Sequence, residues 1–382
     1  MAQFGKKFNP NDKTTITTLL HEAIPLTGTI ASGTYGDLFE NPTNVRTYTH
    51  GMFQSVFDYP FLSSSANHIY DLSVGFHTAT FTEFTGSTLS DADKRKRQNI
   101  YNSMAQTLVG FDTTGSLRKF DENGDLTEGS KYNAVFFINL SRLLYKDEIQ
   151  KGTFSMEMYM GGTYTTPTGS LTYSDFGAAS DYRINSPAGE YGVLYVTAQT
   201  GTTITGKPSA DSSANYRNQF PNVGSNGRAF AGLIFYQAGV VAIPITGTAT
   251  NAAFPAFAGN VYSASFGQGS IADMMASGSV NDFCNNFRHR IKNIEFNNTT
   301  ELQSSIYFCR VGHNEFNYSG NPSYLSSSKI VVKDDATDTP VSYLTTVGLY
   351  SPNNELLAVA KLSEPLRKTP ETEYVLRVRL DY

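Results

Sequence analysis

Apolar and polar residues alternate along much of this chain, with the period of two that is typical of half-buried strands. The alternation predicts strands at 69–76 and 154–160, and a run of β-forming residues predicts another at 191–198. Near the C-terminus, strands are predicted at 328–334, 341–351 and 355–363, and a terminal strand at 373–382 alternates again. We therefore expect a mainly β fold, with β-sandwich-like domains and a few short helices as minor α+β elements.

A continuous apolar run occupies residues 229–245. It is shorter than the roughly 20 residues that a helix needs to cross a bilayer. It also contains Gln237, Gly239 and Pro244. A buried hairpin is the better interpretation, with strands at 230–236 and 240–245 joined by a turn at Gln237-Ala238-Gly239.

Two segments have the spacing of amphipathic helices. The first covers residues 90–110, where Ser90 is the expected N-cap and Ile100, Met104 and Leu108 repeat on one face. The second follows Ser279, a capping residue in front of VNDFCNNFRHRI.

Short polar clusters between apolar runs predict turns. Asn297-Asn298-Thr299 separates IKNIEFNN from SSIYFCRV, which predicts a hairpin within 291–311. DTTG at 112–115 and DENG at 121–124 predict a tight β-meander. A final turn is expected at 365–370, before the terminal strand.

Changes in composition predict three domains. Residues 1–160 form a β-rich N-terminal domain that contains the amphipathic helix at 90–110. Residues 161–279 form an insertion rich in Gly, Ser and Thr, which holds the hairpin at 229–245. Residues 280–382 form a C-terminal antiparallel β domain.

Charge and composition exclude several classes of protein. The net charge is −5, which argues against a dedicated nucleic-acid binder. The two cysteines cannot form a disulfide framework, and the N-terminal residues lack the apolar core of a secretory signal. We therefore expect no nucleic-acid partner, no membrane partner, and assembly in a reducing cytoplasm.

Cys284, His289, Cys309 and His313 supply the side-chain types of a zinc site. On a helix, positions five apart are rotated by roughly 140° from each other. On a strand, positions four apart lie roughly 13 Å from each other. The four residues are thus a weak zinc candidate, and buried free cysteines with surface histidines explain them more simply.

The segment GTTITGKP at 201–208 resembles a phosphate-binding loop. Pro208 replaces the Ser or Thr whose hydroxyl holds magnesium, and no apolar helix follows. A chance match in a loop rich in Gly and Thr is the better interpretation, and we expect no cofactor.

Asp121, Asn123 and Asp125 resemble the start of a calcium loop. Leu126 stands where that loop needs glycine, and Tyr132 stands where it needs a bidentate glutamate. A turn held by Asp and Asn side chains explains these residues without a metal.

Two basic runs could contact phosphates. Lys94-Arg95-Lys96-Arg97 lies in the first half of the predicted helix, and we interpret it as the helix's solvated face. Arg288-His289-Arg290 is interpreted as pairing with carboxylates at a domain or subunit contact.

No pattern of residues predicts catalysis. The chain contains neither G-x-S-x-G nor H-E-x-x-H, and its paired carboxylates, such as Asp334-Asp335, flank turns. The histidines His21, His50, His68 and His77 are scattered among aromatic residues and are expected to make structural hydrogen bonds. We therefore expect no enzymatic activity.

Three segments resemble virion structural proteins of large tailed bacteriophages, including myoviruses and marine phages. They are YTHGMFQSVFDYPFLSSSANHIYDLSVGF, the hairpin AGLIFYQAGVVAI, and VSYLTTVGLYSPNNELLAVAKLSEPLRKTPETEYVLRVRLDY. The resemblance is strongest over about 281–382 and 48–80, where it consists of strand-and-turn patterns typical of tail and baseplate-associated components. It implies no catalytic residues.

The resemblance implies a structural subunit of a tail, baseplate or neck, assembled in the host cytoplasm and located in the virion. Its implied partners are copies of itself and other virion structural proteins, in an oligomer within a symmetric particle. Two alternatives remain open, a receptor- or glycan-binding fibre or adaptor protein and a virion-associated hydrolase.

Overall fold

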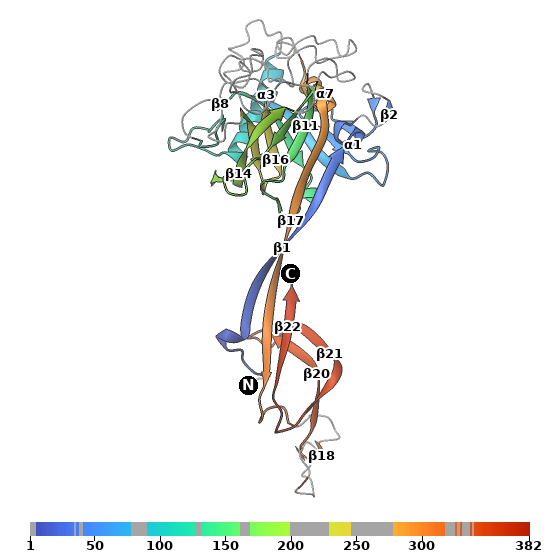
Figure 1. The fold of residues 1–382 in the computed structure, drawn as a ribbon, viewed down its shortest axis with the longest axis vertical. Coiled ribbons are helices and arrows are strands. Elements are labelled where there is room, and N and C mark those ends of the chain that lie inside the picture. Colours follow the sequence, from blue (N-terminus) through green and yellow to red (C-terminus); the bar gives the residue numbers. More distant parts are fainter. Residues whose placement is uncertain are drawn as a thin grey trace. The chain divides into compact units, whose positions relative to one another are not determined.

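The computed structural model describes residues 5–33, 36–37, 41–77, 90–126, 131–160, 169–198, 229–245, 278–317, 325–326, 329–330, 337 and 340–382. The chain is mainly β, as its sequence predicts. It divides into two compact units. The central unit comprises Leu20–Thr300, and the terminal unit comprises Met1–Leu19 with Glu301–Tyr382. Both limits fall inside long strands, β1 (Lys13–Thr27) and β17 (Ile291–Val311), which lie side by side in the sheet (Figure 1).

One antiparallel sheet organises the central unit. Its strand order is β17-β11-β12-β14-β15-β16-β9-β6-β5-β4. The strands other than β17 are β4 (Val45–Thr47), β5 (Gln54–Phe57), β6 (His68–Phe76), β9 (Ala134–Leu140), β11 (Ser155–Met160), β12 (Gly169–Ser174), β14 (Gly189–Ala198), β15 (Ala229–Phe235) and β16 (Val240–Pro244). Shorter strands are β2 (Gly36–Asp37), β3 (Asn41–Pro42), β7 (Phe120–Asp121), β8 (Lys131–Tyr132), β10 (Glu148–Ile149) and β13 (Arg183–Ser186).

The helices are short, apart from two that pack on the middle of this sheet. They are η1 (Pro10–Asp12), α1 (Thr29–Ser32), α3 (Asp91–Leu108), α4 (Arg142–Tyr145) and α7 (Val280–Arg290). Both predicted caps are confirmed. Ser90 Oγ accepts a hydrogen bond from Asp93 N at 3.1 Å, and Ser279 Oγ accepts one from Asp282 N at 3.2 Å. No helix in the described ranges is both long and apolar enough to cross a membrane.

Helices α3 and α7 cover opposite faces of β6. A Cβ on Gly75 would lie 2.6 Å from the backbone nitrogen of Tyr101, so α3 packs directly on this glycine. The next residue, Phe76, points to the other face. There its ring contacts Phe283 of α7, with ring centroids 5.2 Å apart. The centre of the sheet is therefore buried on both sides, and its strands carry continuous apolar runs.

The predicted hairpin at 229–245 is confirmed. Strands β15 and β16 pair antiparallel, with Leu233 opposite Ala242. Its outer neighbours are β14 and β9, so the hairpin lies inside the sheet and its residues from Ala231 to Tyr236 are buried. Consecutive residues point to opposite faces of the sheet, so both faces are buried here, which explains the continuous apolar run.

The hairpin predicted within 291–311 is wrong. These residues form the single 21-residue strand β17, and the predicted turn Asn297-Asn298-Thr299 lies in its interior. The polar side chains there bond to neighbouring segments. Asn298 Nδ2 donates to Leu144 O at 2.9 Å, and Asn297 Nδ2 donates to Gln150 Oε1 at 3.1 Å. Tertiary hydrogen bonds replace the local ones that a turn would need.

The two compact units also differ from the three predicted domains. Strand β9 of the predicted N-terminal domain pairs with β16 of the predicted insertion. Strand β11 pairs with β17, which the sequence assigned to the C-terminal domain. Pairing between strands distant in sequence joins all three into one sheet, and changes in composition carry no signal for such pairs.

Besides the pairing of β1 with β17, strands pair in three places in the described part of the terminal unit. In the first, β17 pairs with β22 (Tyr374–Asp381), from Ser304 opposite Asp381 to Val311 opposite Tyr374. In the second, β20 (Ser342–Tyr350) pairs with β21 (Leu356–Lys368), coloured red in Figure 1. Strand β21 runs past the predicted turn at Pro365, which lies where the register shifts and a missing N–H breaks no regular pair. The short strands β18 (Leu325–Ser326) and β19 (Lys329–Ile330) pair with each other.

Candidate functional site

The terminal unit buries few of its large apolar side chains. The main hydrophobic cluster lies wholly between Leu26 and Phe296, in the central unit. Among the described residues of the terminal unit, the buried apolar side chains are Ile306, Val311, Leu349 and Val378. The exposed large ones number eleven and are Phe8, Ile16, Leu19, Phe316, Tyr343, Tyr350, Leu356, Leu357, Val359, Val375 and Tyr382. An apolar surface of this size on a small unit is typical of a protein–protein contact.

The densest part of this surface is the outer face of the β20–β21 pair. Val359 lies directly opposite Gly348. A Cβ on Gly348 would meet the Tyr350 ring at 2.9 Å and Leu356 Cδ1 at 3.3 Å, so these side chains surround the glycine on one face. Tyr350, Leu356 and Val359 are 53%, 53% and 51% exposed. We call Gly348, Tyr350, Leu356 and Val359 the hairpin patch.

The opposite face of the same pair of strands is turned inward. Leu349 and Ser342 of β20 and Lys368 of β21 are buried. Sequence analysis treated these strands as an ordinary β domain and missed the patch. A signal was present in LLAVAK, because this run is apolar at consecutive positions and a strand with one solvated face would alternate.

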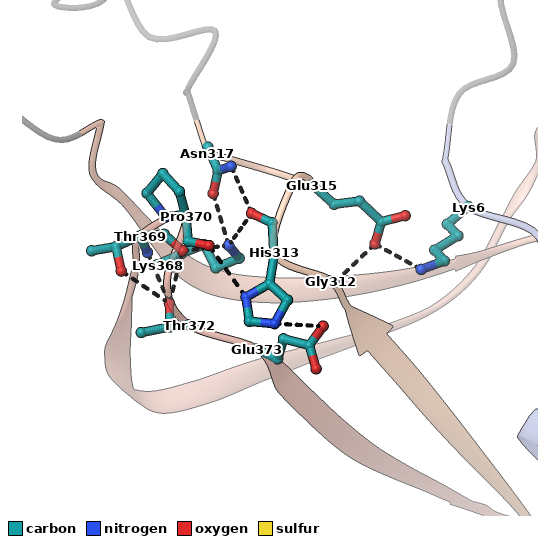
Figure 2. Close-up of polar contacts among 10 residues, drawn as sticks. All are labelled: Lys6, Gly312, His313, Glu315, Asn317, Lys368, Thr369, Pro370, Thr372 and Glu373. Carbon is teal, nitrogen blue, oxygen red and sulfur yellow. Dashed lines mark hydrogen bonds and ion pairs between the residues drawn. The ribbon is translucent and has the colours of Figure 1, made fainter.

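A buried lysine fixes the end of this hairpin (Figure 2). The side chain of Lys368 is fully buried. Its ammonium donates to Thr369 O at 2.6 Å, to Asn317 Oδ1 at 2.7 Å and to His313 O at 3.0 Å. These three oxygens use all three donors of the ammonium. Lys368 therefore links the end of β21 to the segment that follows β17, a role that no local pattern of residues predicts.

His313 and Glu315 make the neighbouring contacts in Figure 2. His313 Nδ1 lies 3.2 Å from Pro370 O, and its Nε2 lies 3.2 Å from a carboxylate oxygen of Glu373. Glu315 accepts from Lys6 Nζ at 2.6 Å and from Gly312 N at 2.9 Å. The hydrogen bond from Lys6 lowers the pKa of Glu315. These contacts connect the segment after β17 to Lys6 near the N-terminus and to residues on both sides of the turn before β22.

The four zinc candidates lie in two places. Cys284 and His289 belong to α7 of the central unit, whereas Cys309 and His313 belong to the terminal unit. Cys284 Sγ donates to Leu72 O at 3.3 Å, and burial raises the pKa of this thiol. Burial and the neighbouring Arg288 lower the pKa of His289 to about 2. Among the residues that the structure describes, no three His, Cys, Asp or Glu side chains come together as metal ligands.

The predicted solvated face of the first basic run is wrong at Arg97. This side chain is 1% exposed, and its guanidinium lies 5.2 Å from the centre of the Phe76 ring and 5.5 Å from that of Phe283. It also donates to Gly278 O. Burial lowers the pKa of Arg97 to about 10. Cation–π contacts with two rings offset part of the desolvation of the guanidinium, so Arg97 links α3 to α7.

Arg288, in the second basic run, does not pair with carboxylates as predicted. Arg288 is buried, and its guanidinium donates to Ser32 O at 2.7 Å, Gly33 O at 3.1 Å and Asn285 Oδ1 at 2.9 Å. Its partners are carbonyl oxygens, where carboxylates were expected. The arrangement satisfies the free carbonyls at the C-terminal end of α1, which a four-residue helix cannot satisfy internally.

The turn predicted for Asp121, Asn123 and Asp125, the residues that resemble the start of a calcium loop, is confirmed. Asp121 Oδ2 accepts from Asp125 N at 3.1 Å and from Leu126 N at 3.0 Å. Asp121 also forms an ion pair with Lys131 at 2.9 Å, which joins β7 to β8. Its carboxylate therefore has protein partners in the positions that a calcium ion would need. The segment at 201–208, whose resemblance to a phosphate-binding loop we interpret as a chance match, lies outside the described residues.

Ser55, His68 and Asp71 form a small polar cluster on β5 and β6. Asp71 Oδ1 accepts from Ser55 Oγ at 2.5 Å and lies 2.8 Å from His68 Nε2. In a hydrolase triad the imidazole lies between the hydroxyl and the carboxylate and takes the hydroxyl proton. Here the carboxylate occupies the middle position, so His68 cannot activate Ser55 in this geometry.

A polar pocket of about 620 Å³ opens in the central unit. Its charged residues neutralise each other, because Lys292 Nζ lies 2.9 Å from Glu157 Oε1. The Lys292 ammonium also lies 6.0 Å from the centre of the Tyr159 ring. The remaining lining comes from the end of β1, α1, the end of α7 and the start of β17, and comprises Thr27, Gly28, Thr29, Ser32, His289, Ile291 and Asn293.

Asp175 is a buried carboxylate with an unusual protonation equilibrium. It accepts hydrogen bonds from Gly152 N at 2.7 Å, Phe154 N at 3.0 Å and Tyr236 Oη at 3.1 Å. Burial nevertheless raises the pKa of Asp175 to about 6. Because the folded pKa exceeds the unfolded one, the stability that this group contributes is present below about pH 4 and is lost as the pH rises past 6.

We therefore expect the free energy of unfolding to decrease through Asp175 by about 2 kcal/mol between pH 4 and pH 7. Urea unfolding of the wild type and Asp175→Asn at several pH values measures this. The amide cannot titrate, so the difference between the two proteins should change by about that amount with pH. A difference that stays constant across this range would contradict the raised pKa.

Comparisons of the chain with protein-family models, with curated proteins and with solved structures find no match.

Proposed function

We propose that this chain is a structural subunit of a bacteriophage virion, in the tail, baseplate or neck, that acts by protein–protein assembly. The observation that carries the proposal is the exposed apolar surface of the terminal unit, centred on the hairpin patch. The described residues of this unit include four buried and eleven exposed large apolar side chains, so the unit gains stability when another protein covers it. The resemblance of the C-terminal strands to tail proteins supports the same role.

The chemistry of the central unit is consistent with assembly and offers little support for catalysis. Buried polar groups such as those of Arg288 and Asp121 form hydrogen bonds to other residues of the same unit. The cluster of Ser55, His68 and Asp71 has the wrong order for a hydrolase triad. We propose that these residues stabilise the fold of the central unit. We propose no enzymatic activity.

Recognition of a receptor or glycan is the weaker alternative. It would use the pocket of the central unit, where Tyr159 is the aromatic side chain that could stack on a sugar. One face of that ring already lies under the Lys292 ammonium. The pocket therefore offers a sugar less stacking surface than its size suggests.

Peptide mass spectrometry of particles purified on a density gradient tests the proposal. The particles come from the phage whose genome encodes this chain, and a non-structural protein of the same phage serves as the control. We expect peptides of this chain at an abundance comparable to that of other structural proteins, with the control protein depleted. If the chain occurs in the infected-cell lysate but not in the particles, the proposal is wrong.

A further inference from the structure

The hairpin patch has features that fit a second copy of this chain as its partner. We propose that the outer face of the β20–β21 pair binds the same face of other copies, so that the terminal unit is a self-association module. The inference names a partner for the exposed apolar surface. Its biological setting rests on the proposed function. Its evidence comes from area, charge and strand pairing in the terminal unit.

The hairpin patch can form the centre of a contact that other exposed side chains of the terminal unit extend. In the described part of this unit, eleven large apolar side chains are exposed by about one half, which leaves roughly 1,000 Å² of apolar surface spread over β1, β20, β21, β22 and the segments beside them. A standard interface buries roughly 800 Å² on each partner, so the contact needs part of this surrounding surface as well. The three side chains of the hairpin patch lie together on one face, and a tyrosine among aliphatic residues is a typical centre for such a contact.

The charge of the terminal unit favours a like partner. Residues 1–19 and 301–382 contain eleven Lys and Arg and eleven Asp and Glu, so this unit has a net charge of zero. The whole chain has a net charge of −5, which therefore resides in residues 20–300. Copies that meet through their terminal units consequently face no net repulsion there, whereas contacts through the central unit would bring like charges together.

The pairing of β20 with β21 also favours a second copy as the partner. In the described part of the chain, β20 and β21 pair with each other and with no other strand. Two isolated strands are marginally stable unless another layer packs on them. A second copy that packs its own outer face against this one covers the apolar side chains and provides that layer.

Sedimentation velocity of the full chain, from about 1 to about 100 μM, tests the inference. The variant carries Tyr350→Thr, Leu356→Thr and Val359→Thr, which remove apolar surface and keep good strand formers. A matched control carries Leu62→Thr, Leu143→Thr and Ile184→Thr, three exposed apolar positions of the central unit. Circular dichroism and thermal unfolding establish that all three proteins are folded.

We expect the wild type and the control to associate over this range, and the patch variant to need at least about tenfold higher concentrations. A wild type that stays monomeric throughout overturns the inference, and so does a patch variant that associates as strongly as the wild type. If the chain is monomeric but occurs in purified particles, the virion role stands and the patch binds a different protein. If it self-associates but is absent from particles, the proposed function fails and the inference about the patch stands.

Discussion

Replacing Gly75 with alanine is expected to lower the free energy of unfolding by about 3 kcal/mol or more. The new Cβ would lie 2.6 Å from the backbone nitrogen and 2.7 Å from the Cα of Tyr101. No change of rotamer relieves a contact with backbone atoms, so α3 must move away from β6. That movement opens the packing between α3 and the sheet, including the edge-to-face contact of Tyr101 with Phe120 at 5.5 Å.

Urea unfolding followed by tyrosine fluorescence measures this loss, since the chain contains no tryptophan. Ser73→Ala is the matched control. It lies two residues earlier on the same strand and the same face, is also buried, and adds no atom in the direction of α3. We expect the control to change the free energy of unfolding by less than about 1 kcal/mol. Equal losses in the two variants would contradict the direct packing of α3 on Gly75.

Elements with strong local signals could be predicted from the sequence. Ser90 and Ser279 cap their helices as expected, because an N-cap depends on the few residues that follow it. The hairpin at 229–245 also has a local signal, since a glycine-containing turn separates two apolar runs of strand length. In these segments local preference and the final structure agree.

Prediction failed where contacts between distant segments override local preference. Asn297 and Asn298 have the composition of a turn, yet they lie within β17 because Gln150 and Leu144 supply their hydrogen-bond partners. Arg97 belongs to a charged run, yet it is buried because Phe76 and Phe283 flank it. No window of the sequence contains these partners, so neither outcome could be derived from local pattern.

The candidate site was missed for a related reason. Leu356 and Val359 are residues that a sequence analysis places in a core. Their exposure follows from the pairing of β20 with β21 alone, which leaves one face of the two strands uncovered. An apolar pattern therefore predicts that the residues are covered. The topology decides whether the same chain or a partner protein covers them.

Replacing Lys368 with methionine is expected to lower the stability of the terminal unit by about 3 kcal/mol. Methionine fills a similar volume but removes the ammonium that bonds to His313 O, Asn317 Oδ1 and Thr369 O. His313 O keeps a bond from Asn317 Nδ2, and Thr369 O keeps bonds from Thr372. The loss of three charge-assisted hydrogen bonds is costly, so the end of β21 should separate from the segment after β17. Amide hydrogen exchange of the full chain should then be faster in β20 and β21, with little change in the central unit.

Lys361→Met is the matched control for this prediction. It makes the same substitution in the same strand, but at an exposed residue. We expect the control to leave amide exchange in β20 and β21 close to that of the wild type. Because the lysine acts through the fit of its three bonds, Lys368→Arg should restore little of the lost protection, since the planar guanidinium does not reproduce the geometry of the ammonium. Unchanged exchange in Lys368→Met would show that the three hydrogen bonds do not hold the hairpin in place.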